Sequence, residues 1–233
     1  MKFHPILFST PMVQAILAGR KTQTRREVKI PPAHFHLENG QWTGESGRVY
    51  TCPYGQVGDL LWVREEHYRF GHWEKDNSKK RKTGRQAWKF VPDSNEVLYF
   101  DNAPTDYRKG RHAKDPYTPT WHKRLARFMP KAQCRIFLEI KNNRVERLQD
   151  ITQKDAIREG IELGEKIKTV VGVMVQTYRN YLSGEFKWMR PALSFRTLWQ
   201  SINGQKSWDS NPFIWVIEFK SIQKPMDFTF SQN

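Results

Sequence analysis

Residues 9–26 read Ser-Thr-Pro-Met-Val-Gln-Ala-Ile-Leu-Ala-Gly-Arg-Lys-Thr-Gln-Thr-Arg-Arg. The opening Ser-Thr-Pro is typical of a helix start, because a hydroxyl can cap the first turn and Pro11 suits the first helical position. Apolar residues in 12–17 recur one turn apart and form one face. Gly19 predicts the helix end, because glycine adopts the left-handed conformation at little cost. The stretch therefore predicts a short packed helix that leads into a basic segment.

The basic segment begins directly after the glycine. It contains four cations and two hydroxyls: Arg20, Lys21, Thr22, Thr24, Arg25 and Arg26. We expect a loop that the packed helix holds in a fixed place and that could bind an anion or the polar edge of a base. The alternative is a solvated basic loop, which composition alone favours.

The composition limits the class of protein. The chain has 233 residues, of which 38% are apolar and 13% aromatic, enough for the core of one large domain with insertions. There are 39 Lys and Arg against 24 Asp and Glu, a net charge of +15. Such a surplus favours a polyanionic partner, most commonly nucleic acid. A generically basic protein is the alternative.

The cysteine and histidine patterns indicate no cofactor and no metal. Cys52 and Cys134 lack the C-x-x-C spacing of a zinc site and are too few for a disulfide scaffold. His34 and His36 have a metal-like spacing, which is weak evidence on its own. No segment has the length or composition of a membrane span or a cleaved signal. We expect a cytoplasmic protein without a membrane partner.

Several segments predict strands. Short apolar runs at 5–8, 60–63, 135–140 and 212–219 are typical of buried strands, and Asn39-Gly40 suggests a hairpin turn. A turn is expected at Asn142-Asn143. Regular crossover helices do not separate these strands, which argues against a doubly wound sheet. The pattern favours an α+β fold with a small, mostly antiparallel β-barrel or curled sheet and short helices at its rim.

Two more helices are expected. Thr152 begins a segment like a capping box, and the short helix that follows runs to about Glu159 and stops at Gly160. Apolar residues in 195–202 follow the i, i+3, i+4, i+7 pattern of an amphipathic helix, which Gly204 ends.

Residues 70–120 differ in composition from the rest. Basic residues are frequent there, scattered among glycines, prolines and aspartates, and 97–100 could form a strand. We interpret the stretch as a basic insertion on the main fold. Trp73, Trp88 and Tyr107 lie among its charges, as in proteins that stack bases and pair phosphates. Alternatively, these rings anchor the insertion to the body of the protein.

Six stretches together resemble the ASCH-domain family, and most of all the longer versions carried by bacteriophages and prophages. They are 6–9, 17–26, 58–65, 144–160, 195–199 and 211–219. The resemblance implies a single domain over 1–233 with insertions at about 67–120 and 161–190. It also implies a PUA-like β-barrel, a cleft for a nucleobase or nucleoside, and the cytoplasm of a bacterial host.

The resemblance also implies an activity. Small members of the family are similar to amidohydrolases that deacetylate N4-acetylcytidine with a lysine, a threonine and a glutamate. Lys21 and Thr24 match the Gly-Arg-Lys-Thr-x-Thr loop, and Glu159 matches the glutamate after the Ile-Thr-x-x-x-Ala stretch. Those small enzymes lack the 67–120 insertion, and this chain has Glu159-Gly160 where they continue differently.

The chemistry of these residue types suits such a reaction. Lys21 can be a general base because neighbouring arginines lower its pKa, and Thr24 can be the nucleophile that it activates. Glu159 is expected near a helix C-terminus, where the macrodipole disfavours a negative charge, which suits a general acid. Arg25 or Arg26 would hold a phosphate or an oxyanion.

Other interpretations stay open. Thr24 could satisfy a backbone group, and Glu159 could pair with Lys21 as a structural ion pair. The chain could be a binding module for RNA or a modified base, with RNA preferred over DNA, or a ribonuclease. Residues expected to contact substrate or nucleic acid are Arg20, Arg25, Arg26, Arg64, Lys79, Lys80, Arg81 and Lys82.

Overall fold

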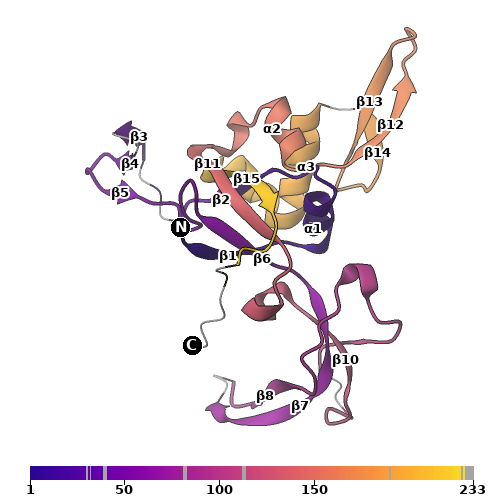
Figure 1. The fold of residues 1–233 in the computed structure, drawn as a ribbon. Helices are drawn as coiled ribbons and strands as arrows, with labels where there is room; N and C mark the ends of the chain where they lie inside the picture. The colour runs from indigo at the N-terminus through magenta and orange to yellow at the C-terminus, as the bar shows by residue number, and fades with distance from the viewer. Residues whose placement is uncertain are drawn as a thin grey trace. The chain divides into compact units, whose positions relative to one another are not determined.

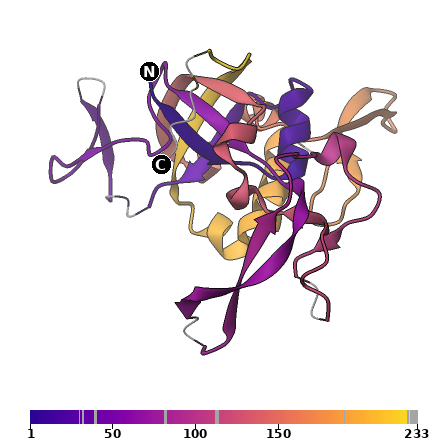
Figure 2. The ribbon, with the colours of Figure 1, turned by 60° about the horizontal axis from the view of Figure 1, so that its bottom comes forward.

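The structure, a computed structural model, describes residues 1–29, 31, 33–38, 41–80, 83–111, 114–188, 190–226 and 228, apart from the side chains of residues 79, 80 and 188. The chain forms two compact units (Figures 1 and 2). Unit 1 comprises residues 1–5, 11–62 and 136–227. Unit 2 comprises residues 6–10, 63–135 and 228–233.

A five-stranded sheet forms the centre of unit 1. Its strand order is β1 (Phe3–Leu7), β6 (Leu60–Arg64), β11 (Phe137–Arg147), β15 (Phe213–Ile222) and β2 (Gln23–Glu27). The pairs β6–β11, β11–β15 and β15–β2 are antiparallel. With short helices beside strand-rich sheets, the fold is α+β, as predicted. In the described residues the strand order does not close on itself.

Helices cover this sheet. They are α1 (Thr10–Leu17), α2 (Gln153–Arg158), α3 (Pro191–Asn203) and α4 (Gln205–Asp209), and the short 3-10 turn η4 (Leu148–Asp150) precedes α2. One hydrophobic cluster joins α3 and α4 to β15 through Phe195, Trp199, Trp208, Ile214 and Val216. The predicted helix ends are confirmed, because Gly19, Gly160 and Gly204 all have positive φ.

Two smaller sheets complete unit 1. One is the hairpin β3 (Phe35–Glu38) and β4 (Gln41–Gly44), followed by β5 (Val49–Tyr50); its expected turn at Asn39-Gly40 lies outside the described residues. The other contains β12 (Leu163–Lys168), β13 (Met174–Arg179) and β14 (Phe186–Trp188), all of which lie in the segment 161–190.

Unit 2 contains a four-stranded sheet in the order β8 (Gln86–Pro92), β7 (His67–Lys80), β10 (Thr120–Arg124) and β9 (Arg108–Lys109). Three 3-10 turns accompany it: η1 (Phe100–Asn102), η2 (Ala126–Phe128) and η3 (Lys131–Gln133). The segment 67–120, expected as an insertion, lies within this unit. Its aromatic residues pack on one another: Trp73 contacts Phe90 edge-on, with ring centroids 5.6 Å apart.

Three expectations about local structure are wrong. The basic segment after Gly19 is not a loop, because residues 23–27 form β2, paired with β15. The turn at Asn142-Asn143 is absent, because β11 continues through it with only a bulge between Ile140 and Asn142. The strand at 97–100 reduces to a single bridge between Leu98 and Tyr68, followed by η1. In the first two cases long-range strand pairing decides the conformation.

None of the helices in the described part of the chain is long and apolar enough to cross a membrane.

Candidate functional site

The end of α1 positions the candidate site. The Gly19 amide donates to the Ile16 carbonyl at 2.9 Å and the Arg20 amide to the Ala15 carbonyl at 2.9 Å, which is a Schellman ending. The chain then turns directly into a backbone bridge between Lys21 and Glu159, the residue at the C-terminal end of α2. Two segments about 140 residues apart in sequence are thereby fixed side by side.

The side chains of these two residues form a buried ion pair. Lys21 Nζ donates to Glu159 Oε2 at 2.9 Å and to the Glu159 carbonyl at 2.9 Å. Arg25 Nη1 donates to the other carboxylate oxygen, Oε1, at 3.0 Å. All three residues are at least 95% buried. The alternative of a solvated basic loop is therefore wrong: these cations are buried because a distant carboxylate pairs with them.

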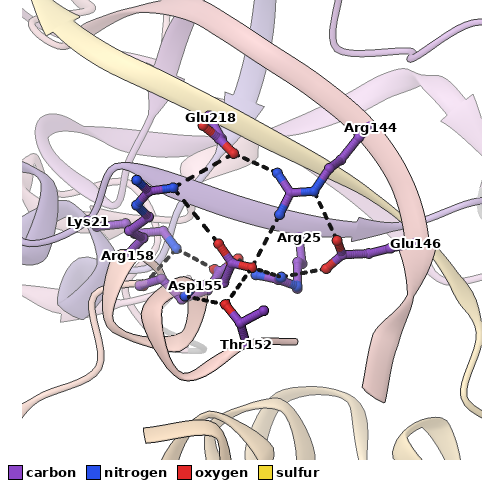
Figure 3. Close-up of polar contacts among 9 residues, drawn as sticks. Lys21, Arg25, Arg144, Glu146, Thr152, Asp155, Arg158 and Glu218 are labelled. Carbon is purple, nitrogen blue, oxygen red and sulfur yellow. Dashed lines mark hydrogen bonds and ion pairs between the residues drawn. The ribbon is translucent and has the colours of Figure 1, made fainter. Parts of the chain in front are cut away.

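The ion pair belongs to a larger charge network (Figure 3). Its members are four cations and four carboxylates: Lys21, Arg25, Arg144, Arg158, Glu146, Asp155, Glu159 and Glu218. Arg25 Nη2 contacts Glu146 Oε1 at 2.6 Å and Asp155 Oδ2 at 3.6 Å. Arg144 extends the network, because its guanidinium contacts Glu146 at 2.9 Å, Asp155 at 3.3 Å and Glu218 at 2.6 Å. Equal numbers of opposite charges keep the network neutral.

Local structure explains why the network forms. Thr152 caps α2 by accepting from the Asp155 amide at 3.1 Å, and its hydroxyl donates to Asp155 Oδ2 at 2.9 Å. In β11, Arg144 and Glu146 are two residues apart and so lie on the same face of the strand. The cap and the strand alternation thus direct the charges of α2 and β11 toward Arg25.

Gly160 allows the close approach of Lys21. Its φ is +82°, and a Cβ at this position would lie 2.7 Å from the Lys21 Cβ. A side chain at Gly160 would therefore strain the backbone and push the segment that contains Lys21 away from the end of α2. Arg20 stays exposed and reaches back to the Gly160 carbonyl at 3.2 Å.

Thr24 lies apart from this network. It pairs with Ile217 in the sheet, and strand alternation directs it to the face of β2 opposite Gln23 and Arg25. The residue is 99% buried, and among the described residues its hydroxyl has no hydrogen-bond partner. Thr24 thus does not cap a backbone group, and its hydroxyl remains available for another contact.

A small cavity brings Thr24 and Glu159 together again. Its volume is about 110 Å³, and it lies beside β2, which is the last strand of its sheet. Residues from both faces of β2 line it, together with Glu159 and an apolar wall: Met12, Thr24, Arg25, Arg26, Glu27, Glu159, Phe195, Leu198, Trp199, Ile202 and Asn203. Arg25 Nε is buried and has no hydrogen-bond partner in the described residues.

The size of the cavity limits its ligand. An engineered apolar cavity of about 150 Å³ holds a benzene ring. At about 110 Å³ the cavity beside β2 is smaller, so it accommodates at most a single small ring. Its apolar wall can hold a planar face, and Thr24 and Arg25 offer a hydroxyl and a guanidinium to polar ring substituents.

Burial changes the proton affinity of the cations. Desolvation lowers the pKa of Lys21; Glu159 opposes this effect, and Arg26 and Arg25 add to it. Desolvation also lowers the pKa of Arg26, opposed by Tyr54 and Glu159. The lysine amine is therefore easier to deprotonate than one in water, in the direction that a general base requires.

The other predicted contact residues belong to unit 2. Arg64 ends β6, and its Nη2 donates to the Arg127 carbonyl. Lys79 and Lys80 are the last residues of β7. Arg81 and Lys82 lie outside the described residues.

The carboxylates that surround Arg25 were not predicted from the sequence. Glu146 and Asp155 lie in stretches used for the family resemblance, but no role was assigned to them. The available signal was the Arg144-x-Glu146 alternation in a strand, which places opposite charges on one face. In the described residues no group of three or more His, Cys, Asp or Glu side chains could hold a metal.

Comparisons of the chain with protein-family models, with curated proteins and with solved structures found no match.

Proposed function

We propose that this chain is an ASCH-type protein with a PUA-like barrel that acts on a nucleobase, and that it deacylates N4-acetylcytidine or a similar N4-acylated cytidine in the bacterial cytoplasm. The observation that carries the proposal is the cavity beside β2. Its volume is that of one small ring at most, and its lining combines apolar residues of α3 with Thr24, Arg25 and Glu159. Glu159 in turn is bonded to Lys21, whose pKa burial lowers.

The Lys21–Glu159 pair can supply both an acid and a base. Moving one proton from the ammonium to the carboxylate converts the ion pair into a neutral amine and a carboxylic acid. Burial lowers the pKa of Lys21, which favours the loss of the proton from this amine. The pair then holds a base for the nucleophile and an acid for the leaving amine.

The proposed reaction has two steps. First, the Thr24 oxygen bonds to the acyl carbon while its proton passes through water to the Lys21 amine, because Thr24 lies on the other face of β2 from the network that holds Lys21. The bond between the acyl carbon and N4 breaks, and N4 takes a proton from Glu159, so cytidine leaves and the ion pair is restored. Second, water hydrolyses the acyl-threonine ester, which releases the carboxylic acid and returns the hydroxyl of Thr24.

The test is incubation of the purified chain with N4-acetylcytidine, followed by chromatography for cytidine. Thr24→Val is the variant of choice, because valine keeps the β-branched shape in β2 and removes a hydroxyl without a partner. It should fold as the parent does and release no cytidine. A Thr24→Val variant with the parent's rate would eliminate Thr24 as the nucleophile.

A second candidate is a non-catalytic module that binds a modified base or RNA. The observation that favours it is the mutual pairing of Lys21, Arg25 and Glu159, which explains all three residues as structure. Under this proposal the parent binds a cytidine derivative without turnover. RNA binding would weaken steeply with salt, because phosphate contacts release counterions. Neutralising Lys79, Lys80, Arg81 and Lys82 would then flatten that dependence.

A further inference from the structure

We propose that unit 2 contains a phosphate-binding site on one face of the β7–β10 ribbon, formed by His67, Arg69 and Arg124. This site lies in a different unit from the cavity beside β2 and does not depend on the proposed deacylation. Strand register, unpaired buried polar atoms and the distribution of carboxylates support such a site.

Strand register places the cations together. β7 and β10 are antiparallel neighbours, in which His67 lies opposite Arg124 and Arg69 opposite His122. Residues two apart in a strand share a face, so all four side chains project from the same face of the ribbon. The two strands also lie side by side in Figure 1. Two guanidinium and two imidazole groups therefore meet on one small surface.

This face lacks carboxylate partners for its cations. Arg124 has no ion pair or side-chain hydrogen bond among the described residues. Instead its guanidinium lies over the rings of Trp73, Phe90 and Phe128, at 4.9, 4.3 and 4.8 Å from their centroids. Such stacking holds the guanidinium in place and leaves its N–H groups for another acceptor.

Three buried polar atoms on this face lack a hydrogen-bond partner in the described structure: His67 Nε2, Arg69 Nε and His122 Nε2. His67 is fully buried; its Nδ1 contacts the Glu65 carbonyl at 3.1 Å, and its Nε2 has no partner. Arg69 donates through Nη2 to the Ser94 carbonyl at 3.0 Å, but its Nε is buried without a partner. Buried polar atoms normally have partners. Because a carbonyl only accepts, Nδ1 of His67 carries a hydrogen, and Nε2 becomes a second donor when the ring is protonated. An anion held by Arg69 and Arg124 would favour that protonated form.

On the opposite face of the same ribbon, the cations have carboxylate partners. There, Lys123 pairs with Glu66 at 3.0 Å and His72 with Asp93 at 3.0 Å. The chain thus supplies a carboxylate to each of these cations on one face and none to His67, Arg69 and Arg124 on the other. A ligand that satisfied the unpaired face would be an anion.

The electrostatics agree with this placement. Burial lowers the pKa of His67 to about 4; the hydrogen bond to the Glu65 carbonyl opposes this effect, and Arg124, Arg69 and Arg64 add to it. Burial and the nearby Arg69 lower the pKa of Arg124 to about 10, so Arg124 remains charged at neutral pH. The charged side chains that act on His67 and on Arg124 are cationic. Phosphate suits this site because it carries up to two negative charges and accepts several guanidinium hydrogen bonds at once.

The phosphate could come from a nucleic-acid backbone or from a free or terminal phosphate group. The experiment follows the histidine side-chain resonances of the whole chain by NMR while the pH is varied. It is done in chloride, in inorganic phosphate at equal ionic strength, and with an oligoribonucleotide that lacks terminal phosphates. An anion against His67 should raise the pH at which this ring titrates by about one to three units.

Arg124→Gln and Lys123→Gln form a matched pair of variants, because each removes one positive charge from neighbouring positions of β10. We expect the shift of His67 in the parent and in Lys123→Gln and its loss in Arg124→Gln. A shift with the oligoribonucleotide alone would assign the site to a backbone phosphate, and one with inorganic phosphate to a free or terminal group.

The proposal is overturned if His67 of the parent titrates at the same pH in all three solutions, a result that needs no variant to fold. An Arg124→Gln variant that keeps the shift would overturn it as well.

Discussion

Lys21→Met should destabilise the chain substantially even though methionine fills nearly the same volume. The change removes the bonds from Nζ to Glu159 Oε2 and to the Glu159 carbonyl, both 2.9 Å long and buried. Breaking a buried ion pair by removing one partner costs about 3–5 kcal/mol. Arg25 stays on the other carboxylate oxygen, so we expect the lower end, about 3 kcal/mol.

The assay is urea unfolding of four proteins: the parent, Lys21→Met, Glu159→Gln and the double variant. If the two side chains interact as the structure shows, the double variant should be more stable than the sum of the single losses predicts, by about 1–3 kcal/mol. A loss below about 1 kcal/mol for Lys21→Met, or strictly additive losses, would refute the buried pair.

Three further predictions concern single positions. Because burial lowers the pKa of Lys21, the unfolded chain binds this proton more tightly. The free energy of unfolding should therefore rise with pH between the folded-state pKa and the ordinary lysine pKa of 10.5, and this contribution should vanish in Lys21→Met, as unfolding at several pH values would show. Burial raises the pKa of Cys52 to about 11, so its alkylation by iodoacetamide at pH 7.5 should be about 100-fold slower than that of an exposed cysteine. Mass spectrometry measures the alkylation rate, and a rate equal to that of an exposed cysteine would contradict this prediction. Gly160→Ala should cost about 2–4 kcal/mol, because its φ is +82° and its Cβ would meet Lys21 at 2.7 Å. Gly19→Ala, with φ +70° and nothing within 4 Å, should cost only about 1 kcal/mol, and equal melting temperatures for the two variants would contradict the clash.

Features that depend on a few neighbouring residues were predictable. Gly19 and Gly160 end their helices because a positive φ is a local property of glycine. The period of residues 195–202 predicted α3, because one face of that helix packs into the core. These inferences needed no knowledge of the tertiary structure.

The burial of the basic segment could not be predicted from its own composition. Arg25 is stable inside the protein because Glu146, Asp155 and Glu159, more than 120 residues later, converge on it. Nothing within residues 20–26 contains that information, and a run of cations usually indicates solvent exposure. The pairing of β11 with β15 likewise overrides the turn preference of Asn142 and Asn143.

The candidate site was predictable only in part. The resemblance named Lys21, Thr24 and Glu159, and the structure joins the first and third of them directly. Thr24 lies on the other face of β2 and meets Glu159 only at the cavity beside that strand. Thr24 reaches the cavity because β2 is the last strand of the five-stranded sheet. The position of a strand within a sheet depends on the whole topology.

The measurement that tests the proposed function most directly is cytidine release from N4-acetylcytidine by the parent and by Thr24→Val, with both proteins shown to be folded. The account predicts release by the parent and none by the variant. No release by a folded parent would contradict the deacylation, and the cavity beside β2 would then be a site that binds a base without reaction.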